Sequence, residues 1–313
     1  MIPKIVVVTG PTATGKTKLA VALARDLNGE IVSADSMQLY RRMDIGTAKV
    51  TPNEAQGVPH HMIDVAGPDE SFSVARYVHD AGRCVDDILS RGKLPILAGG
   101  TNLYIDSLVS GRDFAENEGD NALRESLGAE YDALGGEAML ERLREIDPER
   151  AAKLHPADKR RIIRAIEVYT LSGRTITQHD AETKAIPPRY EAVRIVLDYE
   201  DRAELYRRID SRVDEMVAQG LFDEVKALLD EGLSPDMTAM QAIGYKEPAA
   251  FFRGELTREE AIELIKRESR RYAKRQLTWL RRDDSALRIR WGVSPDFNEA
   301  RRLSTEYLHS RGL

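Results

Sequence analysis

Residues 10–17 read Gly-Pro-Thr-Ala-Thr-Gly-Lys-Thr, between an apolar run at residues 5–8 and an Ala/Leu-rich segment at residues 18–27. A strand, this loop and a helix together form the phosphate-binding pattern G-x-x-x-x-G-K-[ST]. Its glycines let backbone N–H groups surround an anion, and the helix dipole and Lys16 add positive charge. We therefore expect a phosphate site made by Gly10, Pro11, Thr12, Ala13, Thr14, Gly15, Lys16 and Thr17. The Thr17 hydroxyl is a candidate Mg²⁺ ligand. The alternative is a tight strand-to-helix turn that binds nothing.

The composition describes a globular chain with one cysteine. The 313 residues can bury a full core, and 42% hydrophobic with 31% charged residues is typical of a folded protein without membrane spans. The apolar runs are too short to cross a bilayer, and no signal peptide is recognisable at the start. The single cysteine, Cys84, excludes an internal disulfide and a thiolate zinc cluster. We therefore expect a cytoplasmic protein with no membrane partner.

Positive charge is concentrated in two segments although the whole chain has a net charge of −6. Residues 264–282 contain eight Lys or Arg and one Glu, and residues 153–174 contain six Lys or Arg and two acidic residues. The rest of the chain is strongly acidic. This distribution favours local binding of a polyanion. Solvated helix faces with ordinary ion pairs remain the alternative.

Two further strands are expected to deliver polar residues to the edge where the phosphate loop lies. Residues 30–34 form a strand followed by Asp35-Ser36-Met37-Gln38, and residues 94–98 form a strand followed by Gly99-Gly100-Thr101. Ligands of open parallel sheets bind at the carboxyl ends of the strands. Asp35 is thus a candidate base or metal partner, and Thr101 a candidate site residue. For both, a helix N-cap is the alternative role.

The remaining chain divides into an α/β core and a helical insertion. Residues 41–72 are expected to be a loop, in which His60-His61 has a structural or substrate-lining role; metal binding by the pair is the alternative. From 112 to 188 helical patterns follow one another without a buried strand, which predicts an insertion able to move as a lid. A strand returns at 192–198, helices follow at 202–216, 220–231, 238–252 and 257–282, and a short strand at 288–291 precedes a terminal helix. The expected fold is a P-loop NTPase-like parallel sheet flanked by helices, with core 1–111 and 189–313 and insertion 112–188.

Arginines on the helix at 202–216 could neutralise a leaving diphosphate. Arg208 and Arg212 are the candidates, because arginine binds phosphate oxygens through a planar pair of donors. Surface pairing with Asp and Glu one turn away is the alternative.

Seven blocks in order resemble the tRNA dimethylallyltransferases, also called tRNA isopentenyltransferases or the IPP transferase family. They are GPTATGKT at 10–17, DSMQLYRRMDIGTAK at 35–49, PHHMID at 59–64, GGTNLY at 99–104, HPADKRRIIRAIEVY at 155–169, AIGYKE at 242–247 and RRYAKRQLTWLR at 270–281. The resemblance runs nearly end to end. Residues 113–138 match poorly, so no site is expected there.

The resemblance implies transfer of a dimethylallyl group from dimethylallyl diphosphate to N6 of the adenosine 3′-adjacent to the anticodon. In that reaction the phosphate loop, Mg²⁺ and an arginine stabilise the leaving diphosphate. By resemblance Asp35 is the general base and Thr101 helps to position the amine or the diphosphate. The chain would act as a monomer on the anticodon stem-loop of tRNA. The residues implied to bind tRNA are Asp35, Ser36, Met37, Gln38, Arg160, Arg161, Ile162, Ile163, Arg164, Arg271, Lys274 and Arg275.

Three other functions remain open at this stage. A nucleoside or nucleotide kinase would use the same loop and a helical lid, but it leaves DSMQ and the basic helix unexplained. An RNA-binding protein could keep the loop as a structural or regulatory nucleotide site, in which case replacing Asp35 would not impair function. An enzyme that prenylates free adenine nucleotides would not need the basic helix.

Overall fold

A parallel sheet whose central strand precedes the phosphate loop organises the computed structural model. The structure describes residues 2–111, 121–281, 283 and 285–313, so Arg282 and the predicted boundary at 112 lie outside the described residues. Contacts divide the chain into unit 1, residues 1–109 and 189–313, and unit 2, residues 110–188.

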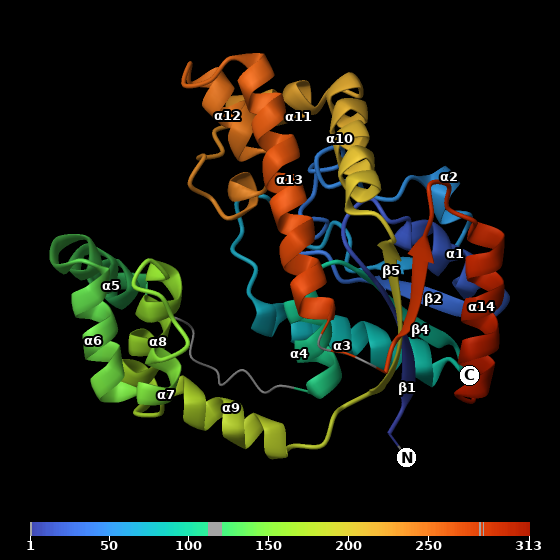
Figure 1. Ribbon diagram of the computed structural model, residues 1–313, viewed down its shortest axis with the longest axis horizontal. Helices are drawn as coiled ribbons and strands as arrows, with labels where there is room; N and C mark the ends of the chain where they lie inside the picture. The colour runs from blue at the N-terminus through green and yellow to red at the C-terminus, as the bar shows by residue number, and fades with distance from the viewer. Residues whose placement is uncertain (1, 112–120, 282, 284) are drawn as a thin grey trace. The chain divides into compact units, whose positions relative to one another are not determined.

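Unit 1 contains the sheet and most of the longer helices (Figure 1). Its strands are β1 (Lys4–Thr9), β2 (Gly29–Ser33), β3 (His60–His61), β4 (Leu94–Gly99), β5 (Glu191–Tyr199) and β6 (Leu287–Trp291). Its helices are α1 (Lys16–Asp26), α2 (Pro52–Ala55), α3 (Val74–Ser90), α4 (Asn102–Ser110, which ends at the boundary), α10 (Arg202–Ala218), α11 (Leu221–Asp230), α12 (Lys246–Phe252), α13 (Arg258–Leu280) and α14 (Phe297–Ser310), with a 3-10 turn at Ala239–Gln241.

The strand order is β3-β2-β4-β1-β5-β6, and every pair is parallel. The strands form because runs of Val, Ile and Leu are buried on both faces, as in β1, where Ile5 to Val8 are 0% exposed. Helices α1 and α14 cover one face, and α3 and α4 cover the other (Figure 1). The expected α/β fold is confirmed.

The register brings the carboxyl ends of three strands to one level. Thr9 at the end of β1 is paired with Gly99 of β4, and Ser33 of β2 is paired with Ala98. The next residues along the chain are the phosphate loop, Thr101 and Asp35. The sheet therefore places all three predicted site segments at one edge.

Some element boundaries differ from the sequence expectation. The predicted loop at 41–72 contains the short elements α2 and β3, which carry no long apolar pattern. The predicted helix at 238–252 is broken into the 3-10 turn and α12 by Gly244, whose φ is +92°. The basic helix α13 begins at a capping box, in which Thr257 accepts from the N–H of Glu260 and the Glu260 carboxylate accepts from the N–H of Thr257.

Unit 2 consists of helices in the residues that the structure describes. They are α5 (Asn121–Leu134), α6 (Gly136–Ile146), α7 (Pro148–Ala151), α8 (Lys159–Ser172) and α9 (Ile176–Ala185). Their apolar faces form a separate core around Leu143, Ile162 and Ile166, all 0% exposed. Asp147 ties the unit together, because its carboxylate accepts from Arg150 N–H and from the N–H and hydroxyl of Thr177.

Candidate active site at the carboxyl edge of the sheet

In the loop between β1 and α1, both glycines of the phosphate-binding pattern, Gly10 and Gly15, have backbone conformations that favour glycine. Gly10 has φ +149°, and a Cβ there would lie 2.3 Å from the carbonyl oxygen of Leu197 on β5. Gly15 has φ +81° and is the N-cap residue of α1. The loop therefore turns back over the sheet and leads directly into the positive end of a helix.

Lys16 lies over this loop. Its Nζ donates to the carbonyl of Pro11 at 2.7 Å, and the Thr14 hydroxyl donates to the same oxygen at 2.8 Å. Burial, and after it the positive charge of Arg212, lowers the pKa of Lys16 to about 7, while the negative charge of Asp35 opposes that shift. An anion beside Lys16 would favour its charged ammonium form, so the site suits a negatively charged ligand.

The two candidate arginines of α10 have different surroundings. Arg212 acts electrostatically on Lys16, and its own pKa is lowered mainly by burial while Asp35 raises it. Its buried Nε has no hydrogen-bond partner among the residues that the structure describes. Arg208 donates to Glu204 at 3.0 Å and to the carbonyl of Val293 at 3.3 Å. Arg212 therefore lies near the phosphate loop. Arg208 instead forms an ion pair with Glu204, one turn earlier on the same helix.

Asp35 and Thr101 are joined through Ser36. The Asp35 carboxylate accepts from the N–H of Met37 at 2.9 Å, and the Thr101 hydroxyl accepts from the N–H of Ser36 at 3.0 Å. The residues after Asp35 form turns, so the helix N-cap alternative for Asp35 is wrong. The bond with Ser36 points the Thr101 hydroxyl at the DSMQ segment, so it is not simply a cap of α4.

Gln38 is held by the chain at both ends of its amide. Its oxygen accepts from the Ser33 hydroxyl at 3.0 Å, and its nitrogen donates to the carbonyls of Thr47 and Ala48 at 3.2 and 3.3 Å. Gln38, one of the residues predicted to bind tRNA, therefore has an amide of fixed orientation.

Gln276 and Tyr272, on α13, are site residues that were not predicted individually. The Gln276 side chain is 4% exposed, accepts from the N–H of Thr12 at 3.1 Å and donates to the carbonyl of Gly100 at 2.9 Å. The Tyr272 hydroxyl bonds with Thr101 and Gln276, and burial together with Asp35 raises its pKa to about 12. A polar amide within the apolar stripe of a basic helix was the signal available in the sequence.

The cations of α13 have two different roles. Lys266 pairs with Asp214 at 2.8 Å and Arg270 pairs with Asp210, so both hold α13 against α10. Lys274 and Arg275 are exposed, and Arg275 lies 5.6 Å from the centre of the Tyr272 ring. The exposed Arg271 pairs with Glu268 on its own helix. The charge of the segment therefore overstates the charge available to a partner.

In unit 2 the predicted RNA-contacting segment lies on α8 and has two faces. Arg160, Arg161 and Arg164 are exposed, and Arg164 pairs with the fully buried Glu167 at 2.9 Å. Ile162 and Ile163 are 0% and 6% exposed in the core of the unit. The prediction that this segment contacts tRNA therefore rests on its exposed arginines, because helical periodicity turns the two isoleucine side chains inward.

The structure also describes the surroundings of the metal candidates. Thr17 is exposed at the first turn of α1, and His61 bonds with the buried Glu30 at 2.8 Å. In residues 2–111, 121–281, 283 and 285–313, no group of three or more His, Cys, Asp or Glu could hold a metal. The Thr17 hydroxyl stays a predicted Mg²⁺ ligand.

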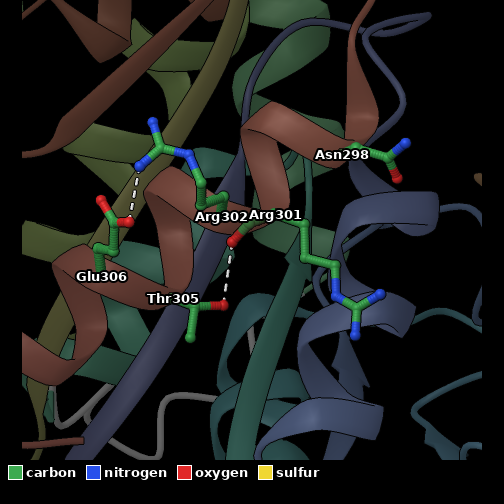
Figure 2. A pocket seen from close by; sticks show the side chains of 5 residues that line it. All are labelled: Asn298, Arg301, Arg302, Thr305 and Glu306. Carbon is green, nitrogen blue, oxygen red and sulfur yellow. Dashed lines mark hydrogen bonds and ion pairs between the residues drawn. The ribbon is translucent and has the colours of Figure 1, made fainter.

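A surface hollow on α14 is separate from this site. It is lined by Asn298, Arg301, Arg302, Thr305 and Glu306 (Figure 2). Arg302 pairs with Glu299 and Glu306, and Arg301 pairs with Asp26. Both arginines of the hollow are therefore paired with carboxylates.

Comparison with known proteins shows the family. A family profile described as IPP transferase matches residues 38–283. The chain belongs to the IPP transferase family. The match begins at Gln38, the last residue of DSMQ, and includes helices α8 and α13.

Relatives align with nearly the whole chain. A protein of Thermoanaerobacter sp. (strain X514) named tRNA dimethylallyltransferase is 47% identical, over 98% of this chain and 97% of its own. A protein of the same name from Desulforudis audaxviator is 50% identical, over 92% of this chain and 91% of its own. The resemblance found in the sequence is confirmed.

Solved structures of family members share the fold. The tRNA isopentenylpyrophosphate transferase of Bacillus halodurans is 42% identical, covers 99% of this chain and 98% of its own, and has a TM-score of 0.73. A eukaryotic dimethylallyltransferase acting on tRNA is 30% identical, covers 89% of this chain and 70% of its own, and has a TM-score of 0.75. Among the described residues of the present chain, no helix is both long enough and apolar enough to span a membrane.

Proposed function

We propose that this protein is a tRNA dimethylallyltransferase. It transfers the dimethylallyl group of dimethylallyl diphosphate to N6 of the adenosine that lies 3′ of the anticodon. The observation that carries the proposal is the placement of one carboxylate, Asp35, beside two cations, Lys16 and Arg212, at the edge of the sheet of an IPP transferase family member. The names of the near-full-length relatives support the same activity.

The cations suit the donor half of the reaction. When the allylic C1–O bond breaks, both bonding electrons go to the diphosphate, and its negative charge grows. The loop N–H groups, Lys16 and Arg212 stabilise that charge. Mg²⁺, held by Thr17 and the diphosphate oxygens, would add Lewis-acid stabilisation when bound.

The carboxylate suits the acceptor half. The N6 amine of adenosine is a weak nucleophile that forms the new N–C bond and must lose one proton, which Asp35 accepts. Thr101, with Tyr272 behind it, positions the reacting groups. The adenosine must leave its stack to reach Asp35.

We also assign the RNA contacts by exposure and charge. Lys274, Arg275 and Arg271 on α13 and the exposed arginines of α8 would bind phosphates of the anticodon stem-loop. The insertion, predicted at 112–188, would act as a lid that carries the second set of contacts. We also propose a monomeric protein and a cytoplasmic location; the tRNA acceptor and the single cysteine, Cys84, support the location.

A transfer assay tests the proposal. Purified protein, Mg²⁺ and radiolabelled dimethylallyl diphosphate are mixed with unmodified tRNA that carries an A-A-A run beside the anticodon. We expect label in tRNA with the wild type, and a loss of at least about 100-fold in Asp35→Ala and Asp35→Asn. Label in AMP alone would indicate a free-nucleotide prenyltransferase. Phosphate transfer from ATP to a nucleoside, with no prenyl transfer, would indicate a kinase. RNA binding without any transfer, unaffected by Asp35→Ala, would indicate an RNA-binding protein.

A further inference from the structure

One carboxylate on α11 binds the backbone of a loop that is distant in sequence. Oε2 of Glu224 accepts from the N–H groups of Asp44 at 2.9 Å and Ile45 at 2.8 Å, and its Oε1 accepts from the N–H of Gly46 at 3.1 Å. Three successive N–H groups thus converge on a single ionisable side chain. An acid accepting several backbone bonds holds a loop more firmly than neutral groups do.

A buried tyrosine completes this arrangement. The hydroxyl of Tyr245, which is 0% exposed, donates to Oε1 of Glu224 at 2.6 Å. A Cβ on Gly46 would lie 2.5 Å from the Tyr245 ring, so loop and ring are in close contact. Burial and the Glu224 charge raise the pKa of Tyr245 far above its usual range, which keeps the hydroxyl a donor. We call Glu224, Tyr245 and residues 44–46 the loop clasp.

The clasped loop continues to Gln38. The carbonyls of Thr47 and Ala48, which directly follow the clasped residues, accept from the Gln38 amide nitrogen. Carbonyl oxygens cannot donate, so the NH₂ of the amide must face them and its oxygen must face the Ser33 hydroxyl. The loop clasp therefore determines where the acceptors that orient Gln38 lie.

We propose that Glu224 is a positioning residue for the acceptor base, acting through residues 44–48 to orient the Gln38 amide. The inference rests on the proposed function, because it assigns the role of Glu224 to the RNA half of that reaction. The donor half is built from the phosphate loop, Lys16 and Arg212, none of which the clasp contacts in the bonds described above. Loss of the clasp should thus impair use of the RNA and leave the diphosphate donor unaffected.

The variants are chosen by the bonds that each one removes. Glu224→Gln can keep one oxygen for Asp44 and Ile45, but its NH₂ cannot accept from Gly46. Glu224→Ala removes all four bonds, and Tyr245→Phe removes one. Asp230→Asn is the matched control, because Asp230 lies on the same helix and forms only a surface pair with Lys226 among the described residues.

Steady-state kinetics with an anticodon stem-loop RNA measure kcat and KM for each substrate. We expect kcat/KM for RNA to fall about 10-fold in Glu224→Gln and up to about 100-fold in Glu224→Ala, since bonds to a charged group are lost. KM for the donor should stay within about twofold, as should all constants of Asp230→Asn. Equal losses for donor and RNA, accompanied by a lower melting temperature, would show a general structural role and overturn the proposal.

A double-mutant cycle tests the route through Gln38. If Glu224 acts through that amide, Gln38→Ala lowers kcat/KM for RNA, and adding Glu224→Gln to it causes no further loss. The proposal would be overturned if the losses in kcat/KM of the two single variants multiplied in the double variant. It would also be overturned if Gln38→Ala were as active as the wild type. Absence of transfer by the wild type would instead refute the proposed function, so the two failures are distinguishable.

Discussion

Replacing Arg212 and Arg208 by alanine, one at a time, and measuring kcat tests which of the two arginines stabilises the leaving group. Both lie on α10 one turn apart, but Arg212 acts on Lys16 and Asp35, whereas Arg208 pairs with Glu204. Removing one preorganised donor to developing charge typically costs about 10²- to 10³-fold in kcat. We expect that loss for Arg212→Ala.

The same reasoning gives a small effect for Arg208→Ala. Arg208 is partly exposed, and its buried partner Glu204 keeps a second cation, Arg207, when Arg208 is removed. The expected loss in kcat is therefore below about fivefold. The donor KM of Arg212→Ala should change less than its kcat, because loss of the Arg212 charge lets the pKa of Lys16 rise and keeps more of that lysine protonated.

Single-turnover transfer with saturating donor and RNA measures the chemical step directly. Arg212→Lys should recover part of the rate, because it restores charge without the planar pair of donors. Equal rates for the two alanine variants, or a larger loss for Arg208→Ala, would refute the placement of Arg212 at the leaving group.

Three further predictions follow from burial and charge. Because the pKa of Lys16 is lowered to about 7, the lysine is mostly neutral above that pH, and donor affinity should weaken as pH rises from 7 to 9. Calorimetric titration should show proton uptake on binding that is reduced in Lys16→Arg, and equal uptake would contradict this. Lys274→Ala should lower the slope of log affinity for RNA against log salt by about 1, whereas Arg270→Ala, whose charge is paired with Asp210, should leave it unchanged. Ile162→Ala should destabilise unit 2 by about 2–4 kcal/mol in denaturant unfolding, and a cost below about 1 kcal/mol would argue against its core position.

Local patterns were sufficient for the parts of the protein that local physics controls. The phosphate loop needs only a strand, two glycines with positive φ and a helix start, all within residues 4–26. The strands preceding Asp35 and Thr101 were recognisable because parallel strands are apolar runs. Helical periodicity also predicts the buried positions of Ile162 and Ile163, which the family resemblance had included among the residues that bind tRNA.

Residues that act through distant contacts could not be assigned in this way. Arg208 and Arg212 share a face of α10, so only the docking of that helix on the sheet decides which one is level with Lys16. The bonds from Gln276 to Thr12 and from Glu224 to Asp44 span 264 and 180 residues. The amino-acid sequence by itself determined the sheet, the phosphate loop, the family and the basic helix. Tertiary packing decided which cations face the site and which carboxylate holds the loop, because helix spacing defines a face but not its neighbour.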